Sequence, residues 1–421
     1  MTQAHAATLF GAEYEALAQK YRPIFQRIRD TALQREHNRQ LGVDAIHWLK
    51  EVRFGAVRVP VEYGGDGATL PQLFQLLIEL ADADSNIVQA LRGHFAFVED
   101  RLNAPRDART EVWLRRFAAG DLVGNAWTEV GDVAIGDVIT RVSKRDGGWV
   151  VNGRKYYSTG SIFGDWVDLY ARLEDGTDII AAVHSHQPGV THHDDWDGFG
   201  QRTTGSGTSV YENAVVQEEN IFPFASRFKY QTAFYQLFHL ATLAGIARAI
   251  TREVAQQVRE RKRIFSTGNA PAVAQDVQVQ QVVGEVSALA YAAEATAIRA
   301  TFAAQRAYDA HWAGDAEQER QANIEAELES AQGQVAISDF VLRAATQFFN
   351  ALSASATASS KSLDRHWRNA RTVASHNPRI LKARVVGAHA VNGTPPPYAW
   401  SIGGTRRRQD WAEGTPPPAG T

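Results

Sequence analysis

Cysteine is absent from this chain of 421 residues, and the initiator is its only methionine. Without thiols the protein can form no disulfide, no thiolate nucleophile and no cysteine-ligated metal site. A chain that lacks both of the readily oxidised residues also tolerates peroxide well, although a composition bias of the lineage explains the same absence.

Long apolar runs and one-sided charge are missing too. No stretch approaches the roughly 18 uninterrupted apolar residues of a membrane-spanning helix, and the N-terminus lacks a basic start followed by an apolar run. The 44 Lys and Arg residues nearly balance 47 Asp and Glu residues, for a net charge of −3. The basic run of arginines at 406–408 is too short for a nucleic-acid site. We therefore expect a cytoplasmic protein that binds neither nucleic acid nor membranes.

Glycine-rich phosphate loops are also lacking. The nearest matches to GxGxxG are GDG at 65–67 and GSG at 205–207, and neither follows a strand and opens a helix. The sequence contains no GxxxxGK[ST] motif, so it indicates no site of its own for NADH or ATP. The run HHDD at 192–195 indicates no metal site, because consecutive side chains alternate between the faces of a strand.

Hydrophobic periodicity divides the chain into three parts and a tail. Residues 1–120 have helical spacing of their apolar positions. Residues 121–225 alternate apolar and polar side chains and contain DGG and DG turns, which predicts a compact β domain of barrel form. Helical spacing returns over 226–393 in long alanine-rich blocks that favour a helix bundle. Residues 394–421 are rich in proline and glycine, and we expect an extended arm there.

Two short stretches of the β domain place small polar groups beside aromatic rings. They are GNAWTEVGD at 124–132 and GRKYYSTGS at 153–161. Aromatic side chains can cover the face of a flat ring system, while hydroxyl and amide groups bond its polar edge. Turn residues that bond their own backbone give a similar pattern, so neither stretch is specific alone.

In this order the two stretches resemble motifs of the acyl-CoA dehydrogenase superfamily. Three further segments resemble it as well: PVEYGGDG at 60–67, DGFGQRTTGSGTSVYENAVV at 197–216 and RNAR at 368–371. The resemblance runs from about residue 50 to 393. It implies an α+β fold with an N-terminal helical domain, a central β-barrel domain and a C-terminal four-helix bundle. A flavin would lie between the β domain and the bundle, with help from a neighbouring subunit.

The resemblance also implies which residues meet the flavin. The two β-domain motifs would line the ring from either side, and an arginine of the bundle's first helix, followed by an aromatic residue, would hold the phosphates. RKRIF at 261–265 stands at that place, although a solvated helix face explains it equally well. The expected cofactor-binding residues are Asn125, Trp127, Thr128, Tyr157, Ser158, Thr159, Arg263, His376 and Asn377.

One position separates two branches of this superfamily. In the dehydrogenases, the segment that RNAR resembles is followed by a glutamate, which removes the substrate's α-proton. In this sequence Asn377 stands at the place of that glutamate. An amide has no useful basicity, so the α-proton loses its base at this position. Some members carry the base on another helix. An FAD-dependent acyl-CoA dehydrogenase is therefore one alternative, and a non-catalytic binding or assembly protein of this fold is another.

The run at 363–393 resembles the flavin-dependent monooxygenases of the superfamily, and we favour this interpretation. The resemblance implies a two-component enzyme that receives FMN as FMNH2 from a separate NAD(P)H flavin reductase, with FAD the less expected cofactor. It also implies a flavin C4a-hydroperoxide formed with O2, and a homotetramer. One oxygen atom would pass to a small, largely apolar substrate: a sulfur heterocycle or sulfone, an aromatic ring or an amine.

Four residues are the expected catalytic groups by this resemblance: His94, His376, Ser158 and Asn125. A histidine with a pKa near 6.5 can give or take the distal peroxide proton. Without the resemblance, a lone helix histidine such as His94 would be taken as a structural residue. Val98 and Val373 stand where one member of the branch has polar side chains, which predicts a more apolar pocket here.

Overall fold

The N-terminal part is helical, as predicted. The structure, a computed structural model, describes residues 3–129, 138–145 and 147–397. Its first elements are α1 (Gln3–Asn38), α2 (Val43–Glu51), α3 (Leu70–Ala83), α4 (Ser85–Ala90), α5 (Arg92–Asn103) and α6 (Ala108–Ala119). Helix α3 opens with a reciprocal capping pair between Thr69 and Gln72 and with Pro71 in its first turn. Since nearly all of its residues are buried, α3 is a core helix.

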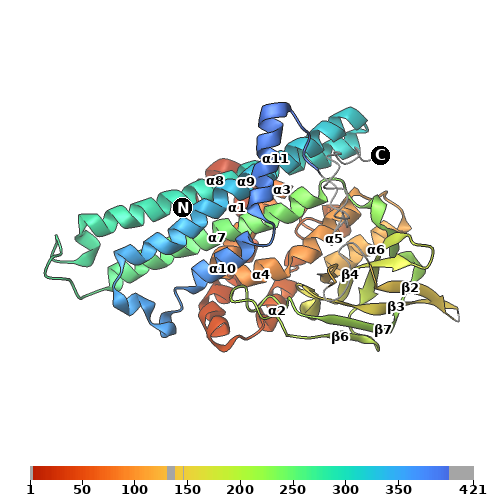
Figure 1. Cartoon of the computed structure of the whole chain (residues 1–421), viewed down its shortest axis with the longest axis horizontal. Helices are drawn as coiled ribbons and strands as arrows, with labels where there is room; N and C mark the ends of the chain where they lie inside the picture. Colours follow the sequence, from red (N-terminus) through yellow and green to blue (C-terminus); the bar gives the residue numbers. More distant parts are fainter. Residues whose placement is uncertain (1–2, 130–137, 146, 398–421) are drawn as a thin grey trace, which may run out of the picture.

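A mixed sheet follows, at one end of the molecule (Figure 1). Its strands are β1 (Val123–Ala126), β2 (Arg141–Arg145), β3 (Gly148–Lys155), β4 (Trp166–Leu173), β5 (Asp178–His184), β6 (Val190–His192), β7 (Ser209–Val216) and β8 (Ile221–Pro223). The hydrogen-bonded order is β6-β7-β3-β2-β4-β5-β8, and β1 pairs with β4. The sheet encloses a core of its own, in which Val151, Leu169 and Tyr211 are buried. The antiparallel pairs β2–β3 and β4–β5 confirm the hairpins expected from DGG and DG.

Long helices form the C-terminal part. They are α7 (Gln231–Glu260), α8 (Val277–Ala313) and α9 (Ala316–Gln347), followed by the shorter α10 (Arg365–Ala374) and α11 (Arg379–Asn392). Figure 1 shows α7, α8 and α9 side by side, and α10 packs against α7 and α9. The fold is therefore the acyl-CoA dehydrogenase-like arrangement that the sequence predicted. The boundaries near residues 120, 225 and 393 stay predictions, and most of the expected arm lies outside the described residues.

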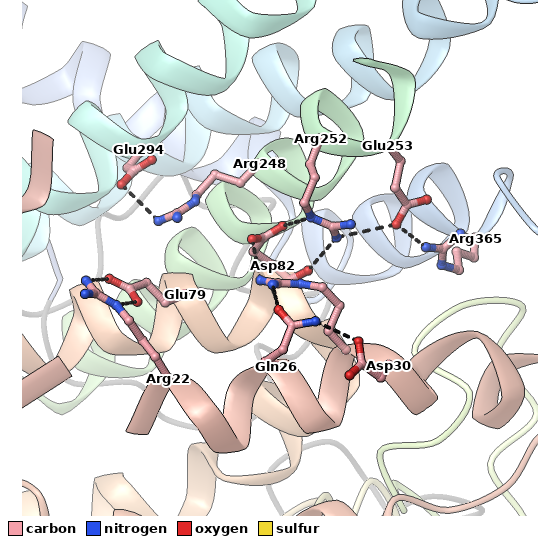
Figure 2. A network of polar contacts seen from close by, with 11 residues as sticks. Arg22, Gln26, Asp30, Glu79, Asp82, Arg248, Arg252, Glu253, Glu294 and Arg365 are labelled. Atoms are coloured by element: carbon pink, nitrogen blue, oxygen red, sulfur yellow. Dashed lines mark hydrogen bonds and ion pairs between the residues drawn. The ribbon is translucent and has the colours of Figure 1, made fainter. Parts of the chain in front are cut away.

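One hydrophobic core joins the N-terminal helices to the bundle, because α3 packs directly on α7 and α8. Polar contacts reinforce the junction (Figure 2). Asp82 on α3 accepts from Arg29 of α1 at 2.8 Å and from Arg252 of α7 at 3.2 Å. Glu253 on α7 pairs with Arg365 of α10. In the part of the chain that is described, no helix is both long and apolar enough to cross a bilayer.

Replacing Asp82 by alanine is expected to lower the free energy of unfolding by about 1–3 kcal/mol, because two arginines lose a shared, mostly buried acceptor. Urea unfolding followed by circular dichroism measures this. The matched control is Asp30→Ala, which removes an exposed acceptor of Gln26 and should change the urea midpoint little. Equal midpoint shifts in the two variants would contradict a stabilising role for Asp82.

Candidate active site

The two polar-aromatic stretches of the β domain lie side by side. The Asn125 N–H donates to the Thr159 carbonyl at 3.4 Å, and the Ser161 hydroxyl donates to the Asn125 carbonyl at 3.1 Å. The Tyr156 N–H donates to the Thr128 carbonyl at 2.9 Å. The structure thus joins the end of β1 to the end of β3, as a shared role of the two stretches requires.

A buried ion pair fixes this junction. Lys155 donates to Glu129 at 2.6 Å and to the Trp127 carbonyl at 3.2 Å. The Glu129 carboxylate also accepts from the backbone N–H and hydroxyl of Thr140. Burial lowers the pKa of Lys155 to about 8, against the opposing effect of Glu129. The pair therefore holds Trp127 and Thr128 next to the 156–159 segment.

The break between α4 and α5 lies against both stretches. A Cβ on Gly93 would come within 2.8 Å of the Asn125 side chain, and one on Gly160 would come within 2.0 Å of the Ala90 carbonyl. Gly160 also has a φ of 79°, which a residue with a side chain rarely adopts. Glycine at these two positions lets the start of α5 pack directly on the ends of β1 and β3.

Several buried polar atoms at this junction have no hydrogen-bond partner within the described residues. They are Asn125 Oδ1, Ser158 Oγ, Arg92 Nε and His239 Nε2. Buried polar groups are nearly always paired, so unpaired ones indicate a ligand that completes them. Amide and hydroxyl groups suit the polar edge of a flavin ring. The residues present therefore fit the group that the sequence implied.

Helix α7 closes the other side of this junction. The Tyr235 ring lies 5.7 Å from the Trp127 ring, centre to centre, and the Arg92 guanidinium lies 5.2 Å from the Tyr235 ring. Further along α7, the buried His239 is 4.2 Å from the ring of His376. The β domain, α5, α7 and the turn after α10 thus meet in one cluster.

His376 and Asn377 form the turn that follows α10. Asn377 is held by the bundle, because its amide donates to Gln236 at 2.7 Å and its carbonyl accepts from Gln334 at 2.6 Å. His376 is solvent-accessible, and the protein packed around it, together with the charge of Arg92, lowers its pKa. His376 is therefore neutral near pH 7 and can offer a ring nitrogen to a ligand.

His94 has a different environment from the one we expected. Its Nε2 lies 2.8 Å from the Gly55 carbonyl, and its Nδ1 accepts from the Val123 N–H at 3.3 Å. The ring also packs edge-on against Phe95 and Phe117. Both ring nitrogens thus contact backbone groups, and His94 links Gly55 to the start of β1. Its catalytic role stays a prediction, without a free nitrogen to support it.

This burial gives a pH prediction. Desolvation lowers the pKa of His94 from 6.5 to about 4, so the folded state takes up its proton less readily than the unfolded chain. Stability is then full above pH 6.5 and falls as the pH drops from 6.5 to 4, by about 3 kcal/mol for this group. Urea unfolding from pH 4 to 7 should show a shallower slope in His94→Gln. An unchanged slope would show that His94 does not contribute.

The remaining predicted cofactor-binding residues of the β domain differ in their contacts and exposure. Trp127 packs among Tyr170, Phe224 and Tyr235. The Thr159 hydroxyl already bonds Ser206 at 2.8 Å, whereas the Thr128 side chain forms no hydrogen bond with the described residues. Tyr157 is 44% exposed and has a φ of 59°, a strained conformation for a residue with a side chain. These contacts leave Ser158 as the clearest unpaired donor of its segment.

Arg263 is not close to this cluster within one chain. Helix α7 ends at Glu260, so Arg263 lies in the exposed segment after the helix and not inside it, as we had expected. Glu260, the last residue of α7, follows His239 by 21 residues, which corresponds to about 31 Å along the helix. We therefore expect contact between Arg263 and a flavin phosphate to come from the neighbouring subunit that the resemblance implied.

Sequence reasoning missed Arg92, Tyr235, Gln236 and His239. Helix α7 reads as an alanine-rich core helix, and a histidine on such a face is usually structural. The signal that could have found the cluster is Arg92, an arginine at the start of a helix whose residues are all buried. No group of three potential metal ligands occurs in the described ranges. In the 192–195 run, Asp194 pairs with Arg39 and Asp195 accepts from Thr208.

Comparison with known proteins agrees with this architecture. Residues 237–378 match the family "Acyl-CoA dehydrogenase, C-terminal domain". Dibenzothiophene monooxygenase of Rhodococcus erythropolis is 25% identical over 401 residues, which cover 89% of this chain and 93% of the relative. "Probable FMNH2-dependent monooxygenase SfnC" of Pseudomonas putida is 28% identical, covering 80% and 85%. The structure of methanesulfinate monooxygenase MsuC from Pseudomonas fluorescens superimposes with a TM-score of 0.81 at 25% identity, covering 91% and 98%.

Proposed function

This chain belongs to the flavin-dependent monooxygenase branch of the acyl-CoA dehydrogenase superfamily, and we propose that it is a two-component FMNH2-dependent monooxygenase. The observation that carries the proposal is the cluster in which buried Asn125 Oδ1 and Ser158 Oγ have no partner among the described residues and His376 is accessible. A relative named as a probable FMNH2-dependent monooxygenase supports FMN as the cofactor.

The residues of the cluster have distinct parts in this proposal. Asn125 and Ser158 would bond the polar edge of FMN, and Trp127 and Tyr235 would border the ring. When bound, FMNH2 would supply the two electrons that activate O2, so that one oxygen atom is added to the substrate and FMN and water are the other products. Neutral His376 holds or passes a proton at a ring nitrogen, and the packed surroundings exclude water from the reacting groups.

Asn377 argues against a dehydrogenase. Its amide is fixed on Gln236 and no carboxylate stands at this position to remove an α-proton. Two features support the proposed homotetramer. Arg263 is expected to reach a flavin phosphate from a second subunit, and Ile380, Leu381 and Val391 expose apolar surface on α11, which projects from the bundle in Figure 1. A separate flavin reductase is part of this proposal, and the lack of a nicotinamide motif in the sequence agrees with it.

Anaerobic stopped-flow absorbance tests the proposal. Purified protein is mixed with photoreduced FMN and then with O2, and the spectrum is followed for the transient absorbance of a C4a-hydroperoxide. A transient that outlasts the one formed by free FMNH2 is expected. Bleaching of bound FAD by an acyl-CoA, without such a transient, would identify a dehydrogenase. Absence of any flavin binding would leave only a non-catalytic role.

A further inference from the structure

Arg92 is a buried cation that lies against Tyr235 of the cluster, and it forms no ion pair with any of the described residues. We propose that it binds an anionic group of the substrate, so that the substrate class is a small organic anion such as a carboxylate or sulfinate. This inference rests on the proposed function and narrows it, because the sequence alone indicated a largely apolar substrate.

The contacts of Arg92 are few for a charged residue in the interior. It is only 7% exposed, and its Nε has no hydrogen-bond partner among the residues that the structure describes. Its contact is the face of the Tyr235 ring, at 5.2 Å. An ionised group taken out of water is costly unless it is paired. The face of an aromatic ring stabilises a buried cation less than a counterion does. The site therefore favours a bound anion.

The neighbouring carboxylates are already used by other arginines. Asp100 pairs with Arg101 and lies 4.0 Å from Arg227, and Asp168 lies 3.2 Å from Arg227. The groups facing Arg92 from the bundle are Tyr235, His239 and His376. Both histidines are uncharged, since burial and then neighbouring positive groups, Arg92 among them, lower their pKa. No negative charge of the described cluster therefore balances Arg92.

The position of Arg92 favours the substrate over the flavin as the source of the anion. Asn125 and Ser158 belong to the β domain, where the ring edge is expected, whereas Arg92 lies against Tyr235 on the bundle. The cluster thus presents one cation beside an aromatic ring and two neutral imidazoles, which suits a substrate that carries one negative group. An uncharged substrate of the same shape would leave Arg92 unpaired.

Binding of matched acids and amides tests this inference. Acetate, benzoate and 2-naphthoate are compared with acetamide, benzamide and 2-naphthamide by calorimetry on the FMN-loaded protein. At least one carboxylate should bind about 10- to 100-fold more tightly than its amide, as expected for a hydrogen bond to a charged group. Arg92→Gln should remove that preference, and Arg92→Lys should keep part of it. Arg115→Gln, on the exposed surface of α6, is the matched control and should keep all of it.

Three results would overturn the inference. They are equal affinity for every acid and its amide in the wild type, an unchanged preference in Arg92→Gln, and weaker FMN binding by Arg92→Gln with the acid preference intact. The last result would assign Arg92 to the flavin. FMN binding by the wild type, measured separately by flavin fluorescence, reports on the proposed function itself. Equal affinity of the wild type for acids and amides, with its FMN binding intact, therefore rejects only the inference and leaves the proposed function standing.

Discussion

Replacing His376 by alanine is expected to speed the release of hydrogen peroxide from reduced FMN and O2 by about 100-fold, with a matching fall in oxygen transfer. His376 is the accessible imidazole of the cluster. Its ring centre lies 4.2 Å from that of His239 in a tilted arrangement, and Asn377 anchors the turn on Gln236. Alanine removes the proton-holding group and admits water in its place, and both changes favour peroxide loss. Stopped-flow absorbance with a peroxide assay measures the rate.

The controls for this experiment lie next to His376. Ser375→Ala removes an exposed hydroxyl that bonds only the Arg371 carbonyl, and it should leave the peroxide rate unchanged. The wild-type rate should be flat between pH 6 and 8, because the pKa of His376 is held below its ordinary 6.5 and the ring stays neutral throughout. If His376→Ala released peroxide at the wild-type rate, His376 would not be a catalytic residue.

Replacing Arg227 by methionine is expected to lower the free energy of unfolding by about 3–5 kcal/mol, the range for breaking a buried ion pair from one side. Arg227 is almost fully buried between Asp168 and Asp100, and its guanidinium stacks on Trp127 at 4.7 Å. Methionine fills similar volume but leaves Asp168 without its cation. Urea unfolding at pH 7.5 measures the loss, and the Trp127 environment reports it by fluorescence.

The pH dependence of this loss identifies its cause. Burial already raises the pKa of Asp168 to about 6, even with Arg227 beside it. Without the arginine the pKa rises further, so the folded variant takes up a proton that the unfolded chain releases above pH 4. The deficit relative to wild type should therefore shrink as the pH falls from 7.5 to 5.

Two companion variants sharpen the Arg227 result. Arg227→Met combined with Asp168→Asn should recover part of the stability, since the pair is coupled. Arg172→Met breaks the partly exposed pair of Arg172 with Asp178 and should cost less than about 1 kcal/mol. A deficit in Arg227→Met that is constant with pH and not relieved by Asp168→Asn would mean that lost packing, and not charge, causes it.

Local sequence pattern was sufficient to predict much of the fold of this protein. The alternation and turns of the β domain, the helical spacing on either side of it, and the order of the five motifs predicted the fold. The sequence analysis placed GNAWTEVGD and GRKYYSTGS on either side of the ring, whereas the structure shows that the two stretches also bond to each other directly. Asn377 could be interpreted from its residue type alone, because an amide cannot act as a base wherever it lies.

Only the tertiary structure decided which side chains lie together in this cluster. Arg92 on α5 and Tyr235 and His239 on α7 are about 140 residues apart along the chain, and each helix looks like an ordinary core helix by itself. Periodicity says which face of a helix is buried but not what it is buried against. For that reason the sequence could not show that His94 has both nitrogens engaged by backbone, that Arg263 is far from the site of its own chain, or that Arg92 is a cation without a counterion.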